Sequence, residues 1–111
     1  MKLSFQDYET LTVLTLSGEF THDDVPQFER VTNERLAAGC RHMALDCEHL
    51  EFIDSRGLET LLRLQERIGG SGGQLRLVNP DDTVRSILRL TRLDLALESH
   101  GTLELAVRSM R

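Results

Sequence analysis

The sequence predicts an α/β fold in which helices pack against a largely parallel sheet. The first observation is the order of strand-like and helix-like segments, β-β-α-β-α-β-α-β-α, because such alternation is typical of parallel strands joined by crossover helices. The second is size: 111 residues, 40% of them hydrophobic, suffice for one core and for a single domain over residues 1–111. The third is the glycine-rich run 69–73, which leaves too little chain beyond it for a second core.

The chain opens with two predicted strands that form a hairpin. Leu3 and Phe5 alternate with polar neighbours, and residues 11–16 are rich in β-branched side chains. Residues 8–10 are short enough to join the two strands, and residues 17–19 are expected to end the second one.

A helix is expected to begin between Asp23 and Pro26, since aspartate is a common N-cap and proline suits a first turn. Apolar residues at near-helical spacing follow, and Gly39 is the predicted residue just beyond the helix C-terminus. Residues 43–45 then predict a short buried strand.

A second helix is predicted over residues 58–68, because its apolar residues recur at helical spacing. The members of this stripe are Leu58, Leu61, Leu62 and Ile68. Glu59 and Arg63 form an i,i+4 pair on the opposite face. The glycine-rich run 69–73 is expected to stop this helix.

The last third of the chain predicts two more strands and two more helices. Residues 75–78 predict a strand that residues 79–80 break. The aspartates at 81–82 are expected to cap the next helix. Leucines alternate with other residues over 93–97, which predicts a last short strand, and apolar residues at helical spacing over 103–107 predict a final helix.

Composition and charge exclude several classes of protein. The net charge is −5 and the pI about 5.3, which argues against a nucleic-acid binder, although arginines gather locally in residues 85–92. The N-terminus has no apolar run of signal-peptide length, and no stretch of 18 apolar residues predicts a membrane span. We therefore expect a cytoplasmic protein without membrane insertion, in which Cys40 and Cys47 are plain thiols.

No constellation of residues predicts catalysis, a metal or a cofactor. The four histidines lack the spacing typical of metal ligands; they are His22, His42, His49 and His100. Asp46 and Asp54 are better explained as surface acids than as a general acid and base. A phosphate-binding loop and a hydrolase nucleophile motif are both missing from the sequence.

The most informative stretch is residues 52–58, between a predicted buried strand and an amphipathic helix. Ser55 lies at that junction, where unpaired backbone N–H groups and the helix dipole favour negative charge. One interpretation is that Ser55, like Asp54, is a structural N-cap. The other is that Ser55 is an accessible phosphorylation site, which would gain about −1.5 to −2 charges. Arg56 would then pair with the phosphate or remain solvated, and Gly57 would allow close packing or the close approach of a partner chain.

Three longer stretches carry a family resemblance: residues 14–20, 45–58 and 72–80. The most specific part is the Asp-Ser-x-Gly-Leu pattern at the end of the central stretch. In these features the chain resembles the STAS domain, which anti-sigma factor antagonists share with the cytoplasmic tails of sulfate transporters. The resemblance implies an α/β STAS fold: a single mixed, partly parallel sheet of four to five strands, with about four helices mostly on one face.

The resemblance also implies a function. In stand-alone members, an anti-sigma factor with serine kinase activity of the GHKL type phosphorylates the serine at the position of Ser55, and a serine phosphatase removes the phosphate. The unphosphorylated protein binds the kinase and frees a sigma factor. By this resemblance Ser55 is the phosphoacceptor, and the partner-binding residues are Thr21, Asp23, Asp54, Ser55, Arg56, Gly57 and Leu58. The chain departs from the family at two of these positions: many antagonists have an acidic residue in place of Thr21 and a small or hydroxyl-bearing residue in place of Arg56.

Two alternatives remain open beside a phosphorylation-switched antagonist. The chain could be a constitutive STAS subunit, either of a lipid-transport ABC complex or of a stressosome-like scaffold, whose binding does not depend on phosphorylation. A small enzyme is the third hypothesis, and the missing catalytic constellation disfavours it.

Overall fold

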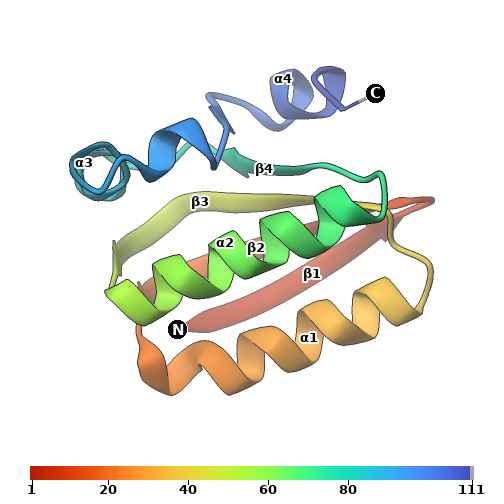
Figure 1. Ribbon diagram of the computed structural model, residues 1–111, viewed down its shortest axis with the longest axis horizontal. Helices are drawn as coiled ribbons and strands as arrows, with labels where there is room; N and C mark the ends of the chain where they lie inside the picture. Colours follow the sequence, from red (N-terminus) through yellow and green to blue (C-terminus); the bar gives the residue numbers. More distant parts are fainter. Residues whose placement is uncertain (111) are drawn as a thin grey trace.

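The computed structural model describes residues 1–110, and its centre is one mixed sheet (Figure 1). The strands lie in chain order: β1 Lys2–Tyr8, β2 Leu11–Phe20, β3 His42–Ile53, β4 Leu75–Val78 and β5 Ser99–His100. β1 pairs with β2 in an antiparallel hairpin, and every later pair is parallel. The predicted α/β class and the predicted order of elements are confirmed.

The described residues form four α-helices and two short 3₁₀ helices. They are η1 His22–Asp24, α1 Val25–Ala37, α2 Ser55–Gly70, α3 Asp82–Leu90, η2 Leu93–Leu95 and α4 Leu103–Arg108. Buried residues of α1, α2 and α3 belong to one large apolar cluster on one face of the sheet, whereas Ala106 of α4 belongs to a separate cluster. Three helices therefore cover one face and α4 the other, as the STAS resemblance implies (Figure 1).

The first half of the central strand β3 is buried on both faces. Met43 and Leu45 point into the large cluster, and Ala44 between them packs with Val78 and Ala106 in the small one. A strand with apolar neighbours on both sides needs no polar alternation, which is why residues 43–45 read as a continuous apolar run.

Two strands are longer than the sequence predicted. β3 covers twelve residues instead of three, and β2 continues to Phe20 instead of ending at residues 17–19. The pairing of β2 with β3 contains two register shifts, and Gly18 has φ 95°, a left-handed value that glycine adopts without strain. These irregularities interrupt the period-two burial pattern and so hide the later parts of both strands in the sequence.

The prediction of a strand over residues 93–97 was wrong. Leu93–Leu95 form the 3₁₀ helix η2, and the short strand is Ser99–His100 instead. In the turn, Leu93 and Leu97 both pack against the core whereas Leu95 is exposed. Alternation of leucines here reflects one tight turn rather than the two faces of a strand.

The C-terminal ends of α1 and α2 test the two predictions that a glycine follows or stops each helix. Gly39 follows α1 with φ 106°, as predicted for the residue beyond a helix C-terminus. α2, by contrast, includes Gly69 and Gly70 and ends at Gly70, so the glycine-rich run stops it two residues later than predicted. Both glycines keep helical backbone because the chain reverses only at Gly72, where φ is 81°.

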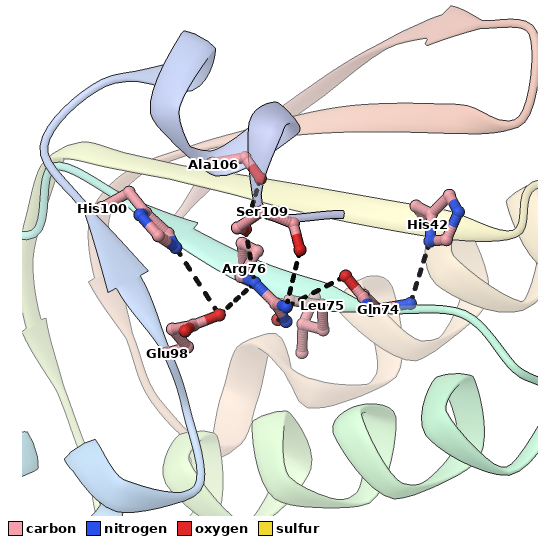
Figure 2. A network of polar contacts seen from close by, with 8 residues as sticks. All are labelled: His42, Gln74, Leu75, Arg76, Glu98, His100, Ala106 and Ser109. Atoms are coloured by element: carbon pink, nitrogen blue, oxygen red, sulfur yellow. Dashed lines mark hydrogen bonds and ion pairs between the residues drawn. The ribbon is translucent and has the colours of Figure 1, made fainter. Parts of the chain in front are cut away.

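A polar network attaches the C-terminal helix to the sheet (Figure 2). Arg76 of β4 is only 13% exposed; its Nε donates to Ser109 Oγ at 2.8 Å, and its Nη2 donates to Gln74 Oε1 at 3.0 Å. The same guanidinium forms an ion pair with Glu98, whose carboxylate also lies 3.5 Å from His100 Nε2. Arg76 therefore ties together β4, the start of β5 and the end of α4.

Candidate functional site

The candidate site begins where β3 ends and α2 starts. Asp54 is the N-cap: its backbone is extended, and its Oδ1 accepts a hydrogen bond from the Gly57 N–H at 2.8 Å. Ser55 is the first residue of the helix and does not cap it. Of the two capping candidates in the sequence, the structure selects Asp54.

The second oxygen of Asp54 binds the loop that follows β2. Oδ2 accepts a hydrogen bond from the His22 N–H at 2.9 Å, and His22 Nδ1 lies 3.7 Å from the same oxygen. The Asp54 N–H donates to the Phe20 carbonyl at 3.0 Å. Asp54 thus holds two segments together that are 32 residues apart in the chain.

The loop itself is closed by a capping box. The Thr21 N–H donates to Asp24 Oδ2 at 2.9 Å, and the Thr21 hydroxyl lies 3.3 Å from the same oxygen. Asp24 Oδ1 accepts from the Met1 ammonium at 3.1 Å. These bonds close the loop over residues 21–24 and tie it to the N-terminus, and the bond between His22 and Asp54 holds it beside the start of α2.

Hydrogen bonding keeps both capping carboxylates ionised. Burial is the largest single influence on Asp54 and raises its pKa, but the hydrogen bonds from Gly57 and His22 together outweigh it, so the pKa lies below its usual value. For Asp24 the hydrogen bond from the Thr21 N–H is the largest influence, and its pKa is lowered as well. Near neutral pH the site therefore carries fixed negative charge at the start of α2.

Ser55 and Arg56 are exposed at the start of α2. Both side chains face solvent, and the Ser55 hydroxyl makes no hydrogen bond within residues 1–110. The hydroxyl can therefore be modified without breaking an internal contact. Asp23 is exposed too, with one carboxylate oxygen 3.3 Å from His22 Nε2.

Gly57 and Leu58 point inward instead. A Cβ on Gly57 would lie 2.8 Å from Ile53 Cγ1 and 3.0 Å from the Phe20 carbonyl oxygen, so the helix start packs too closely on the strand ends for any side chain. Leu58 belongs to the main core. These two residues position the exposed part of the site, which consists of His22, Asp23, Ser55 and Arg56.

Comparison with known proteins identifies the family. Residues 4–104 match the family model described as Mlab, STAS domain. The chain belongs to the STAS family. A Thermotoga maritima protein provisionally named an anti-sigma factor antagonist is 28% identical over 104 residues, which are 93% of this chain and 92% of the relative. The anti-sigma F factor antagonist of Paenibacillus polymyxa is 23% identical over 84% of this chain and 80% of its own length.

Solved structures confirm the STAS fold. The unphosphorylated form of the anti-sigma factor antagonist SpoIIAA superposes with a TM-score of 0.82 at 23% identity, covering 96% of this chain and 93% of SpoIIAA. The phosphorylated form of the Bacillus SpoIIAA superposes with a TM-score of 0.74 at 22% identity, covering 97% of this chain and 98% of that protein.

Sequence reasoning missed His22 and Asp24 as parts of this STAS site. Both lie in the loop after β2, and Phe20 at the end of β2 pairs with Ile53 at the end of β3. The carboxyl ends of parallel neighbours meet at one edge of a sheet, so residues that follow them come together. The parallel pairing of these two strands was the signal available in the sequence, but it predicts only proximity and not the bonds.

The other candidate chemistry is not assembled in this part of the structure. Asp46 lies eight residues before Asp54 along β3, which corresponds to roughly 26 Å of extended strand and is too far for a general acid and base to share a substrate atom. Among residues 1–110, no group of three or more histidine, cysteine, aspartate or glutamate side chains is placed to hold a metal ion. Within the same residues, no helix has the length and apolar character needed to cross a membrane.

Proposed function

We propose that this STAS protein is an anti-sigma factor antagonist switched by phosphorylation of Ser55. In its unphosphorylated form it binds an anti-sigma factor that is a serine kinase of the GHKL type, and the sigma factor is released. Phosphorylation of Ser55 by that kinase ends the binding, and a serine phosphatase restores it. The protein acts in the cytoplasm as a binding partner and not as an enzyme.

The observation that carries this proposal is that Asp54, and not Ser55, caps helix α2. Asp54 caps the helix, so the exposed Ser55 hydroxyl is free of any structural task within residues 1–110. A phosphate there would lie at a helix N-terminus, where the dipole and unpaired N–H groups favour negative charge. The fold can therefore accept the modification without rearrangement.

The same geometry explains how a phosphate would prevent binding. It would add about −1.5 to −2 charges next to the ionised Asp54 carboxylate. A partner surface that accommodates one negative charge would then face roughly three, together with the added bulk. The named relatives support this interpretation, and SpoIIAA is a protein known in both an unphosphorylated and a phosphorylated form.

A second candidate is a constitutive STAS subunit, of a lipid-transport ABC complex or of a stressosome-like scaffold. Arg56 is the observation that favours it, because this exposed cation follows Ser55 directly where antagonists more often have a small or hydroxyl-bearing residue. The same surface would then bind an ATPase or sister STAS domains permanently, with Arg56 as a contact residue.

The test is a pull-down from extract of the source cells with three baits: wild type, Ser55→Asp and Ser71→Asp. Ser71 is an exposed serine just past the other end of α2, about 24 Å from Ser55 along a helix of sixteen residues, so it controls for added charge alone. We expect a GHKL-type kinase with the wild type and with Ser71→Asp, and its loss with Ser55→Asp. Equal capture of an ABC ATPase or of other STAS proteins by all three baits would favour the constitutive subunit instead.

A further inference from the structure

The corner formed by the end of α3 and by η2 exposes two leucines and three arginines. We call it the α3 corner and define it by Arg85, Arg89, Leu90, Arg92 and Leu95. Leu90 is 84% exposed and Leu95 85% exposed, the highest values among the exposed large apolar side chains of the described residues. Figure 1 shows α3 at the end of the sheet where β3 ends.

The backbone holds these leucines outward. The Thr91 hydroxyl donates to the Ile87 carbonyl at 2.7 Å, which closes the end of α3. Arg92 then adopts φ 61°, and the Leu97 N–H donates to the Leu93 carbonyl at 2.8 Å. Leu97 is buried in the core and Leu93 packs against it, which leaves Leu95 between them on the exposed side of η2.

The arginines of the corner are equally free of partners. Arg85, Arg89 and Arg92 are exposed, and within residues 1–110 their side chains make no hydrogen bond or ion pair. Arg85 and Arg89 also line a shallow hollow of about 170 Å³ with Leu88, Asp94 and Ser99. The three arginines outnumber the two exposed aspartates beside them, Asp82 and Asp94, so the corner is weakly basic in a chain whose net charge is −5.

We propose that the α3 corner is a docking surface for an acidic amphipathic helix of a partner protein. Such a helix presents apolar residues at intervals of three or four, which would cover Leu90 and Leu95, and carboxylates beside them, which would pair with the three arginines. Complementary charge steers such a segment to the corner, and burial of the leucines supplies affinity. This surface shares no residue with the site around Ser55, although both lie at the end of the sheet where β3 ends, and the proposal does not depend on the phosphorylation switch.

A nucleic acid or an anionic membrane fits the corner less well. Either would bring a dense array of negative charge close to the whole chain, which is itself acidic, and to Asp82 and Asp94 next to the arginines. A short acidic helix can place its few carboxylates beside the arginines and away from these two aspartates, which a uniform array of phosphates cannot do.

The probe is a synthetic peptide of 18 residues with leucines at helical spacing and glutamates elsewhere, titrated into the ¹⁵N-labelled full chain and followed by NMR. We expect amide shifts confined to α3 and η2, and at least tenfold weaker binding for Leu90→Ser/Leu95→Ser and for Arg85→Glu/Arg89→Glu. The matched controls are Leu105→Ser, a 47% exposed leucine on α4, and Arg30→Glu on α1. Both controls should bind as the wild type does.

Three further probes decide against other occupants: the same peptide with lysine in place of glutamate, a mixed-sequence DNA duplex, and vesicles of phosphatidylcholine with phosphatidylglycerol. The proposal stands if only the acidic peptide shifts the corner. It is overturned if the lysine peptide binds equally well, if the duplex or the vesicles bind at the corner more tightly than the acidic peptide, or if millimolar acidic peptide causes no shift there.

Discussion

The Asp54 carboxylate lies 2.8 Å from the Gly57 nitrogen and accepts its hydrogen bond, which makes Asp54 the cap of α2. The bond leaves Ser55 as the first residue of the helix, with its side chain in solvent. The structural cap and the proposed phosphoacceptor are therefore adjacent residues, and substitutions can separate their roles.

Ser55→Ala should leave the free energy of unfolding within about 0.5 kcal/mol of the wild-type value, because it removes no internal contact. Asp54→Ala should lower that free energy by about 1–2 kcal/mol, since it removes the cap and the bond to the His22 N–H. Urea unfolding followed by circular dichroism measures both. A loss for Ser55→Ala as large as that for Asp54→Ala would show that Ser55 has a structural role after all.

Gly57→Ala should destabilise the fold by about 1–3 kcal/mol, because the new methyl group would lie 2.8 Å from Ile53 Cγ1 and 3.0 Å from a backbone carbonyl oxygen. Gly69→Ala in the same helix is the matched control. Its Cβ meets nothing within 4 Å, so alanine should stabilise the protein by about 0.5–1 kcal/mol. Thermal unfolding of the two variants should therefore move in opposite directions, and a stabilised Gly57→Ala would contradict the close packing at the strand ends.

The elements that sequence analysis predicted well are those set by local pattern. β4 has the predicted bounds of Leu75–Val78, and Asp81 caps α3 through a 2.9 Å hydrogen bond from the Val84 N–H. β2 and β3 were predicted too short because register shifts between them decide where burial falls. Such register shifts depend on how the partner strand pairs, so they cannot be predicted from the sequence of one strand alone.

The candidate site likewise contains residues that the sequence could predict and one that it could not. Asp54 and Ser55 belong to one contiguous motif that the sequence displays, together with Gly57. His22 joins the site through its backbone N–H, a group that nearly every residue has, and across 32 residues of chain. Neither residue type nor spacing could have predicted that bond, so His22 was considered in the sequence only as a metal ligand.

Acid should remove part of the stability that Asp54 provides. Its folded pKa is lowered from 3.8, so the stabilisation is present above that value and is lost as the pH falls through the folded pKa. The free energy of unfolding of the wild type should therefore fall more steeply than that of Asp54→Asn between about pH 5 and pH 2. Asp23→Asn, at an exposed carboxylate outside the cap, is the control and should follow the wild type. Parallel curves for wild type and Asp54→Asn would refute the assignment.

Arg76→Lys should loosen α4 without unfolding the sheet. Arginine at this position donates to Ser109 and Gln74 and pairs with Glu98, and a single ammonium cannot reach all three (Figure 2). Ala106 is the one residue of α4 that is fully buried, so few apolar contacts would replace the lost bonds. A loss of about 1–3 kcal/mol should raise amide exchange over residues 103–110 by roughly 5- to 150-fold.

Hydrogen exchange followed by mass spectrometry measures this change, with Arg85→Lys as the matched control, because Arg85 is exposed and its side chain has no partner within residues 1–110. Exchange in β2 and β3 should stay at the wild-type rate, since the main core lies on the opposite face of the sheet from α4. Faster exchange in those strands as well would mean that Arg76 supports the whole domain. Unchanged exchange in α4 would mean that the small apolar cluster around Ala106 is sufficient to hold the helix.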